Sequence, residues 1–246
     1  DYIDLSAYKI SPNEKLLALT IDTSGSELHK LTIKDIKTGE ILDDYLSNLD
    51  GSVEWANDNK TLFYTVLDKA HRSYQLWRHE LGNEQSDDVL VFQEDDDRFS
   101  VGLHRTKSGE FLKMDLESQI TTEVYLLDRN DPFGEWKLVQ PREQGVEYYV
   151  YHHGDYLYQI TNKDAINFKM IRTTLNGGKE DEIIPNRDNT TLDNVSMFKY
   201  HMAVLERVNG NLEIRLFNFE DESWYNIEMN EDIYSVTFEE NYDWNS

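Results

Sequence analysis

The chain has 246 residues, and its 48 Asp and Glu against 24 Lys and Arg give a formal net charge of -24. This excess of acid excludes a nucleic-acid binder, which needs clustered cations to displace counterions from phosphates, and an anionic membrane would repel it. Hydrophobic residues make up 39% and aromatic residues 12% of the chain, which suits a packed core and excludes disorder. The acidic surface favours solubility, and it would attract cationic peptides or metal ions.

Cysteine is absent from the sequence, so disulfides and thiolate metal sites are excluded. No apolar run is long enough to predict a membrane-spanning helix. The first residues, Asp1-Tyr-Ile-Asp4, have neither the basic nor the apolar region of a signal peptide, and we expect a cytoplasmic protein. Because the sequence does not begin with Met, we expect it to be a piece of a longer polypeptide.

Short runs rich in Val, Ile, Leu, Tyr and Phe recur along the chain, each bounded by Gly, Asn, Asp or Ser. They group in fours, and the groups start near residues 7, 51, 99, 146, 194 and 234, about 40 to 48 residues apart. That period fits four short antiparallel strands with their turns, which make one blade of a β-propeller. A leucine-rich solenoid would repeat at about half this length, and helical repeats would show a period of about 3.6 residues.

The predicted strands follow in chain order. The first two blades, about residues 7–48 and 51–94, contain Ala7–Ile10, Lys15–Asp22, Lys30–Ile36 and Ile41–Ser47, then Gly51–Trp55, Thr61–Leu67, Tyr74–Leu81 and Asp88–Gln93. The next two, about 99–143 and 146–187, contain Phe99–Arg105, Glu110–Leu116, Thr122–Asp128 and Trp136–Gln140, then Val146–His152, Tyr156–Thr161, Phe168–Thr174 and Glu182–Pro185. The fifth, about 191–230, contains Asn194–Phe198, His201–Arg207, Leu212–Phe219 and Trp224–Glu228.

The predicted fold is therefore all-β, a propeller of about five four-stranded antiparallel blades, with a partial sixth at residues 234–246 whose first strand would be Tyr234–Phe238. In Lys15–Asp22 both alternating faces are apolar, which is expected where a blade lies between two neighbours. A β-sandwich is the structural alternative, but it would not explain a four-strand period that is repeated five times.

An ordered series of short segments resembles a known protein family. The segments are Asp22-Thr-Ser-Gly-Ser-Glu27, Ser52-Val-Glu-Trp55, Thr61-Leu-Phe-Tyr64, Arg78-His-Glu-Leu-Gly82, Asp88-Val-Leu-Val91, Glu94-Asp-Asp96 and Pro141-Arg142. In this order they resemble the propeller of the oligopeptidase B (protease II) group in the prolyl oligopeptidase family of serine peptidases. The likeness runs over almost the whole chain and is densest from about residue 8 to 170.

The resemblance implies a seven-bladed propeller joined to an α/β-hydrolase domain with a Ser-Asp-His triad. Five blades and a start of a sixth would make this propeller incomplete, and we expect the hydrolase domain to be absent. A nucleophile elbow needs Gly-x-Ser-x-Gly, and no two glycines here stand four positions apart. We therefore predict no catalytic residue, no cofactor and no metal ligand in the chain, which should be inactive by itself.

In the intact family enzyme the propeller covers the active site and admits short peptides, so it is a gate and a size filter. The expected partners are the hydrolase domain of the same parent polypeptide and short cationic peptides. Three residues are candidates for contacts with that domain: Glu27, in the tight loop after Asp22, and, with weaker grounds, Arg78 and Glu94. The alternative for the loop is that Asp22 only caps the turn through backbone N–H groups.

Other polar clusters have structural interpretations. The acidic run Glu94–Asp97 lacks the spacing of an EF-hand loop and is expected to be a solvated loop between blades. His152 and His153 would point to opposite faces of a strand, so they are not expected to share a metal ion, and each of the other histidines is expected to be packed or hydrogen-bonded. Two other functions remain open: a stand-alone propeller that serves as an interaction module, and a five-bladed propeller glycosidase with two carboxylates at its channel.

Overall fold

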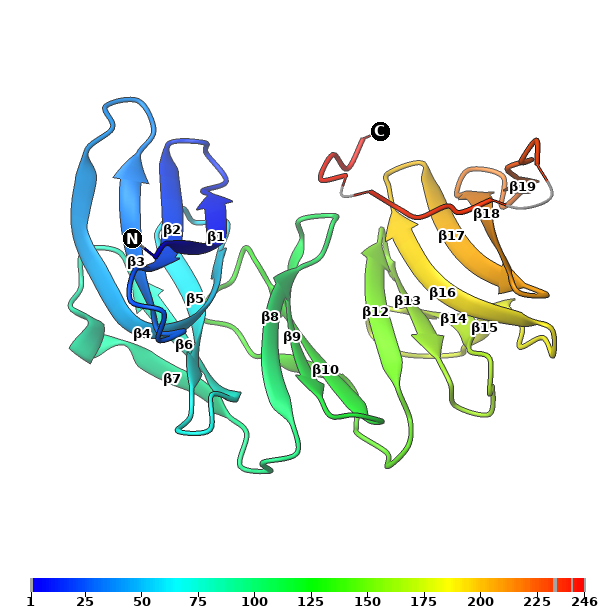
Figure 1. The fold of residues 1–246 in the computed structure, drawn as a ribbon, viewed down its shortest axis with the longest axis horizontal. Helices are drawn as coiled ribbons and strands as arrows, with labels where there is room; N and C mark the ends of the chain where they lie inside the picture. The colour runs from blue at the N-terminus through cyan, green and yellow to red at the C-terminus, as the bar shows by residue number, and fades with distance from the viewer. Residues whose placement is uncertain (1, 232–233, 240, 246) are drawn as a thin grey trace. The chain divides into compact units, whose positions relative to one another are not determined.

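A computed structural model describes residues 2–231, 234–239 and 241–245 of the chain. Its contacts divide it into two compact units. The first comprises Asp1–Arg105 and Gly109–Arg142, and the second comprises Thr106–Ser108 and Glu143–Ser246. Each unit consists of antiparallel strands in which neighbours along the chain are also neighbours in the sheet (Figure 1).

The first unit contains eleven strands and one short 3-10 helix. They are β1 (Asp4–Ile10), β2 (Leu16–Asp22), β3 (His29–Asp35), β4 (Ile41–Trp55), β5 (Thr61–Leu67), β6 (Ser73–Glu80), η1 (Gln85–Asp87), β7 (Val89–Gln93), β8 (Ser100–Arg105), β9 (Phe111–Glu117), β10 (Thr122–Asp128) and β11 (Lys137–Gln140). Strands β1 to β7 form one sheet in chain order, and β8 to β11 form a four-stranded sheet.

The second unit contains two four-stranded sheets, again in chain order. The first has β12 (Tyr148–His153), β13 (Tyr156–Thr161), β14 (Lys169–Thr174) and β15 (Asp181–Ile184). The other has β16 (Thr190–Met197), β17 (His201–Val208), β18 (Asn211–Asn218) and β19 (Trp224–Asn226). The prediction of four-stranded antiparallel sheets is confirmed, and these strands lie within a few residues of their predicted positions.

The predicted division between the first two blades is wrong. Ile41–Ser47 and Gly51–Trp55 were expected as separate strands of two blades, but they form the single fifteen-residue strand β4. Leu49 lies opposite both His29 on β3 and Val66 on β5, so the first part of β4 closes blade 1 and the second part opens blade 2. The two blades therefore share one strand and merge into the seven-stranded sheet (Figure 1).

The start of a sixth blade was expected at Tyr234–Phe238. Residues 234–239 form no strand, and residues 232–233, 240 and 246 of the predicted segment and its approach lie outside the described residues.

The core of the first unit depends on strands that are buried on both faces. Strand β5 shows this most clearly, because successive side chains of a strand point to opposite sides of the sheet. Leu62 and Tyr64 join one apolar cluster, with Trp55, and Phe63 joins the next, with Leu112 of the neighbouring blade. Strand β5 thus lies between two apolar clusters. In β2, where two apolar faces predicted the same arrangement, Ala18, Thr20 and Asp22 are buried, but Leu17, Leu19 and Ile21 are half-buried. Full burial of a side chain such as Phe63 contributes about 1.5–3 kcal/mol.

A buried arginine joins blade 2 to blade 3. The guanidinium of Arg129, which is 4% exposed, donates hydrogen bonds to the carbonyls of Trp55 (3.0 Å) and Gly109 (2.7 Å). The backbone of Asn57 donates to the carbonyl of Arg129 (2.8 Å). Burial lowers the pKa of Arg129 to about 10, so it stays charged at neutral pH and holds the end of β4 against the β9–β10 sheet.

Candidate functional site

The loop after β2 is organised by one carboxylate. Asp22 accepts the backbone N–H groups of Ser24 (2.7 Å), Gly25 (3.2 Å) and Glu27 (2.8 Å), and also the hydroxyl of Ser24 (2.7 Å). The Ser24 hydroxyl, together with these backbone groups, lowers the pKa of Asp22 to about 2. Gly25 and Glu27 both have positive φ, 79° and 62°, which lets the chain reverse tightly. The turn-capping role of Asp22 is thereby confirmed.

Glu27 lies at the tip of this loop with its side chain 72% exposed. Its carboxylate is 3.0 Å from Nδ1 of His71, in the turn between β5 and β6. The pair thus links the end of a hairpin in blade 1 to the end of a hairpin in blade 2. Its exposure leaves Glu27 accessible to another domain, and its role in such a contact stays a prediction.

Arg78 lies on β6 and is engaged within the chain. Its guanidinium carbon is 4.5 Å from the centre of the Phe133 ring, and it donates a hydrogen bond to the Pro132 carbonyl (3.4 Å). Both partners belong to the loop between β10 and β11, so Arg78 connects blade 2 to blade 3. An additional contact with another domain stays a prediction.

Glu94, which follows β7, is also engaged within the chain, and its side chain is only 7% exposed. It accepts hydrogen bonds from Arg142 (2.6 Å) and from the backbone of Asp96 (2.9 Å). Arg142 also bonds Glu123 (3.1 Å) and lies 4.0 Å from the centre of the Phe99 ring. Glu94 therefore belongs to a largely buried ionic network inside the first unit, and its inter-domain role stays a prediction.

The acidic loop Glu94–Asp97 surrounds a guanidinium. Arg72 donates hydrogen bonds to the carbonyls of Glu94 (3.3 Å), Asp96 (3.0 Å) and Phe99 (2.7 Å). Its own position is fixed by Asp68, whose carboxylate lies 2.9 Å from Arg72 Nε. Asp95 and Asp97 are exposed, as expected of a solvated loop, but Glu94 is buried. The sequence could not show this, because the cation that binds the loop lies 22 residues upstream of Glu94.

The two adjacent histidines on β12 have separate partners, as predicted. His152 is buried, with Nε2 2.7 Å from the Gly154 carbonyl and Nδ1 2.8 Å from the hydroxyl of Ser108, which groups with the same unit. His153 stacks on Phe219 with ring centres 3.6 Å apart. A hydroxyl beside an imidazole is one element of nucleophilic catalysis, but here a backbone carbonyl, not a carboxylate, orients the ring. The two rings thus engage different neighbours, in keeping with their predicted positions on opposite faces of a strand.

A buried charged cluster in blade 2 was not predicted. His79, 0% exposed, lies with Nδ1 2.7 Å from Asp88 and Nε2 3.4 Å from Asp44. The hydroxyl of Tyr64 donates to the second oxygen of Asp88 (2.8 Å), and the backbone of Gly82 donates to Asp44. Burial opposes protonation of His79, but the hydrogen bonds and charges of Asp88 and Asp44 outweigh it and raise its pKa. The cluster has the composition of a proton-transfer site, yet its burial makes its role structural.

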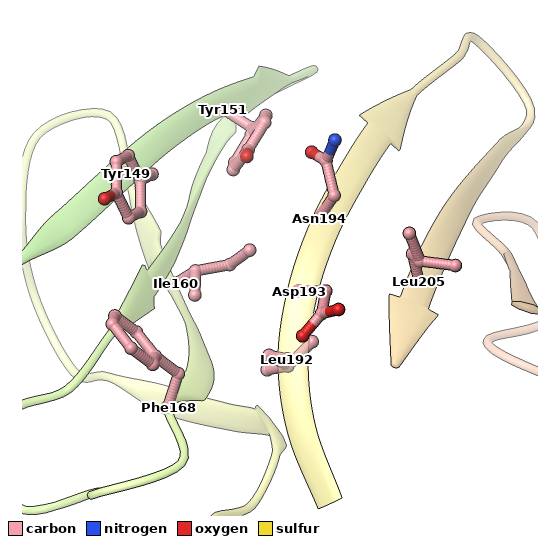
Figure 2. Close-up of a pocket in the computed structure, with 8 residues that line it drawn as sticks. All are labelled: Tyr149, Tyr151, Ile160, Phe168, Leu192, Asp193, Asn194 and Leu205. Carbon is pink, nitrogen blue, oxygen red and sulfur yellow. The ribbon is translucent and has the colours of Figure 1, made fainter. Parts of the chain in front are cut away.

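A cleft of about 580 Å³ opens in the second unit (Figure 2). Side chains from β12 and β13, and Phe168 just before β14, face those from β16 and β17 across it (Figure 2). The eight lining residues are Tyr149, Tyr151, Ile160, Phe168, Leu192, Asp193, Asn194 and Leu205.

The floor of the cleft is apolar, and its edge is polar. Ile160, Leu192 and Leu205 are 3%, 6% and 6% exposed. Asp193 is the only carboxylate among the lining residues, and Arg207 neutralises it at 2.9 Å. The cleft can hold an apolar or aromatic group, but it lacks the two carboxylates that glycoside hydrolysis requires. In the sequence these lining residues have the pattern of ordinary strand residues, so the sequence could not have predicted the cleft.

In the part of the chain that the structure describes, no three His, Asp or Glu side chains gather closely enough to hold a metal ion. Over the same residues, no helix has the length and apolar character that a membrane span requires.

Comparison with known proteins extends these observations. Protease 2 of Moraxella lacunata is 31% identical over 250 residues, which cover 100% of this chain and 36% of that protein. Dipeptidyl aminopeptidase BI of Pseudoxanthomonas mexicana is 31% identical over 241 residues, which cover 96% of this chain and 33% of that protein. The chain thus spans about a third of the length of these relatives.

The fold is similar to that of oligopeptidase B. The enzyme from Leishmania major superposes with a TM-score of 0.87 and 26% identity, over 94% of this chain and 34% of that one. The enzyme from Trypanosoma brucei gives a TM-score of 0.84 and 28% identity, with the same coverage. These matches confirm the predicted β-propeller class and favour the peptidase interpretation over the glycosidase one. Residues 1–246 match the family described as prolyl oligopeptidase, N-terminal beta-propeller domain, and the chain belongs to that family.

Proposed function

We propose that this chain is the substrate-gating propeller of an oligopeptidase-B-like serine peptidase that acts on short basic peptides. The catalytic hydrolase domain would lie in another part of the same polypeptide. The observation that carries the proposal is the extent of the match: the propeller family covers all 246 residues, while the chain covers only 36% of Protease 2 of Moraxella lacunata. The remaining length of such a relative is enough for a hydrolase domain that cleaves the peptide bond.

Charge supports the choice of substrate. The net charge of -24 raises the local concentration of cationic peptides around the propeller. Because salt screens exposed charges over about 8 Å at physiological ionic strength, this steering should weaken as salt is added. We also propose that the enzyme is cytoplasmic. The chain has no cysteine, and a cytoplasmic protein does not depend on disulfides for stability.

Within this proposal the propeller does not break bonds. It limits access, so that a short peptide reaches the active site and a folded protein does not. Glu27 is the best placed of the three candidate contacts to the hydrolase domain, because its side chain is 72% exposed whereas that of Glu94 is 7% exposed.

The test compares the full-length parent protein with the 246-residue chain. We expect the parent protein to cleave a short Arg-containing peptide amide, to lose activity with a serine-directed inhibitor, and to leave the same sequence uncut inside a folded protein. The 246-residue chain should cleave none of them. Cleavage of the amide by the chain alone, or equal cleavage of the folded substrate by the parent protein, would contradict the proposal.

A further inference from the structure

Five charged or titratable side chains gather across blades 1, 2 and 3, in a set that the proposed function does not use. They are Lys9 on β1, Glu54 on β4, His104 on β8, and Lys113 and Asp115 on β9. Lys9 Nζ lies 2.6 Å from Glu54, and Lys113 Nζ lies 3.1 Å from Asp115. The charges of all four act on His104, so the five groups form one electrostatic unit, here called the Lys9–Lys113 cluster.

Strand register explains how three of them meet. His104 lies directly opposite Lys113, and Gly102 lies directly opposite Asp115. Because side chains two residues apart share a face of a strand, His104, Lys113 and Asp115 project from the same face. Gly102 leaves room for the imidazole: a Cβ at this position would lie 3.2 Å from Nε2 of His104. His104 Nε2 is thereby 3.7 Å from the Asp115 carboxylate.

The neighbouring blades are fixed at this point. The indole of Trp55, 1% exposed, donates a hydrogen bond to the backbone carbonyl of Lys9 (2.9 Å). This bond holds β1 beside β4, next to the Lys9–Glu54 ion pair. The cluster is therefore built on rigid strands and not on loops, which makes it suitable for a binding site.

Exposure separates the cations from the acids. The side chains of Glu54 and Asp115 are only 5% and 7% exposed. Those of Lys9, Lys113 and His104 are 40%, 19% and 61% exposed. Solvent therefore meets the cationic ends of both ion pairs, with the carboxylates beneath them, on a protein whose net charge is -24. An ammonium has three N–H donors, and one bond to Glu54 leaves Lys9 with donors for a ligand.

The protonation of His104 suits a neutral donor. Desolvation lowers the pKa of His104, and the charges of Lys113 and Lys9 lower it further. The charges of Asp115 and Glu54 raise it, but they do not reverse the shift. At neutral pH the imidazole is therefore uncharged and can donate one N–H. An anion that binds beside it would favour the imidazolium, so binding can be followed through His104 itself.

We propose that Lys9, His104 and Lys113 form a binding site for a carboxylate, namely the C-terminal carboxylate of a short peptide. The net charge of the chain, -24, favours this ligand, because it repels free anions and attracts molecules that also carry positive charge. A short basic peptide with a free C terminus satisfies both demands. Charge-assisted N–H donors of this kind bind carboxylates, and two of them, Lys113 Nζ and His104 Nε2, lie 3.1 Å and 3.7 Å from the same Asp115 oxygen. The inference rests on the proposed function, because it takes its ligand from the peptides that the parent enzyme would act on.

The test measures binding of Ala-Ala-Ala and of its C-terminal amide to the full-length protein, by calorimetry. The amide is the more cationic molecule, so unspecific attraction to an acidic protein would favour it. Charge-assisted hydrogen bonds should instead make the free acid bind about tenfold more tightly. The imidazole resonance of His104, identified by its loss in His104→Gln, should titrate at higher pH with the acid and not with the amide.

A double substitution removes a lysine together with its carboxylate partner, so that no buried carboxylate is left without a cation. In the Lys113→Met/Asp115→Asn variant the tenfold preference for the acid should fall to nearly one. Lys69→Met, which removes a lysine from an exposed turn, should keep it. Gly102→Ala changes no charge but displaces the imidazole, so it should weaken binding of the acid and tests the site even where the paired variant does not fold.

Three results would overturn the assignment: equal affinity for acid and amide, a preference that survives in the paired variant, or inorganic phosphate that displaces the acid at equal concentration. The peptidase proposal is judged separately by hydrolysis. A parent protein that binds the acid but cleaves no peptide would refute the proposed function and leave the carboxylate site. A parent protein that cleaves peptides but binds acid and amide equally would refute only the site.

Discussion

Each unit of the chain contains a buried charged cluster, and the two have opposite composition. In blade 2 an imidazole, His79, lies between the carboxylates of Asp44 and Asp88. In blade 5 a carboxylate, Glu206, lies between the guanidinium groups of Arg187 and Arg215. His79 is 0% exposed and Glu206 is 1% exposed, so each central group depends on its partners for the contacts that water would otherwise supply.

The difference lies in the central side chain. The blade-2 cluster is centred on an imidazole, whose ordinary pKa is near neutrality and whose neutral form has one N–H for two carboxylates. The blade-5 cluster consists of a carboxylate and two guanidinium groups and contains no imidazole. We therefore expect the charge of the blade-2 cluster to change near neutral pH.

The largest effect is expected from Glu206→Gln, which leaves two arginines around an uncharged amide. Arg215 bonds both oxygens of Glu206 at 2.7 Å, so the carboxylate is held at both positions. We expect the free energy of unfolding to fall by about 3 kcal/mol, measured by urea denaturation. Glu220→Gln, at an exposed turn, should change it by less than about 0.5 kcal/mol. A loss below about 1 kcal/mol in E206Q would show that the triad contributes little.

His79→Gln tests the pH-sensitive cluster and should cost about 2 kcal/mol at pH 6. The pKa of His79 is raised above its ordinary 6.5. Its stabilisation is therefore complete below about pH 6.5 and is lost as pH rises through the raised pKa. The Tm of the wild type should fall over that interval relative to the Tm of H79Q, while E206Q should retain the wild-type pH dependence. Parallel curves for wild type and H79Q would contradict this assignment.

Tyr64→Phe removes the hydroxyl that donates to Asp88 at 2.8 Å and leaves the ring, which is 2% exposed, in place. The expected loss is about 1 kcal/mol, measured by urea denaturation. The matched control is Tyr225→Phe, because Tyr225 is 55% exposed and should tolerate the change. Equal stability of Y64F and Y225F would show that the Tyr64 hydroxyl does not contribute to the free energy of unfolding.

The smallest effect on stability is expected from Glu27→Gln, because an exposed ion pair contributes about 0–1 kcal/mol. If Glu27 contacts the hydrolase domain, the same substitution should lower peptidase activity of the full-length protein while its Tm stays unchanged. Glu40→Gln, another exposed acid of blade 1, is the control for both measurements. Unchanged activity in E27Q would remove Glu27 from the candidate inter-domain contacts.

The strands and turns could be predicted because their signals are local. Asp22 caps its turn through residues within five positions, and the run of aromatic, aliphatic and β-branched side chains in Thr61–Leu67 marks a strand whether or not its neighbours are known. The wrong division of β4 into two strands also has a local cause. The predicted break fell at residues 48–50, between Ile41–Ser47 and Gly51–Trp55, but Asn48 and Gly51, with positive φ values of 61° and 114°, lie inside the continuous strand β4.

The charged clusters could not be predicted, because burial of an acid depends on residues far away in the sequence. Asp44 meets His79 across 35 residues, and Glu94 meets Arg142 across 48. In a chain with 48 Asp and Glu, these few buried acids have no mark that separates them from solvated ones. The position of Lys9 over Glu54 is hidden for the same reason, since it arises only when β1 and β4 lie side by side.

The continuous strand β4 has a consequence for how the protein opens. Blades 1 and 2 hold β4 through hydrogen bonds on both of its edges, from β3 on one side and β5 on the other. The two ladders meet at Leu49 with no loop between them, so we expect the two blades to open as one cooperative segment. In native-state hydrogen exchange the amides of β3 and β5 should share one opening free energy, although they belong to different repeats of the sequence.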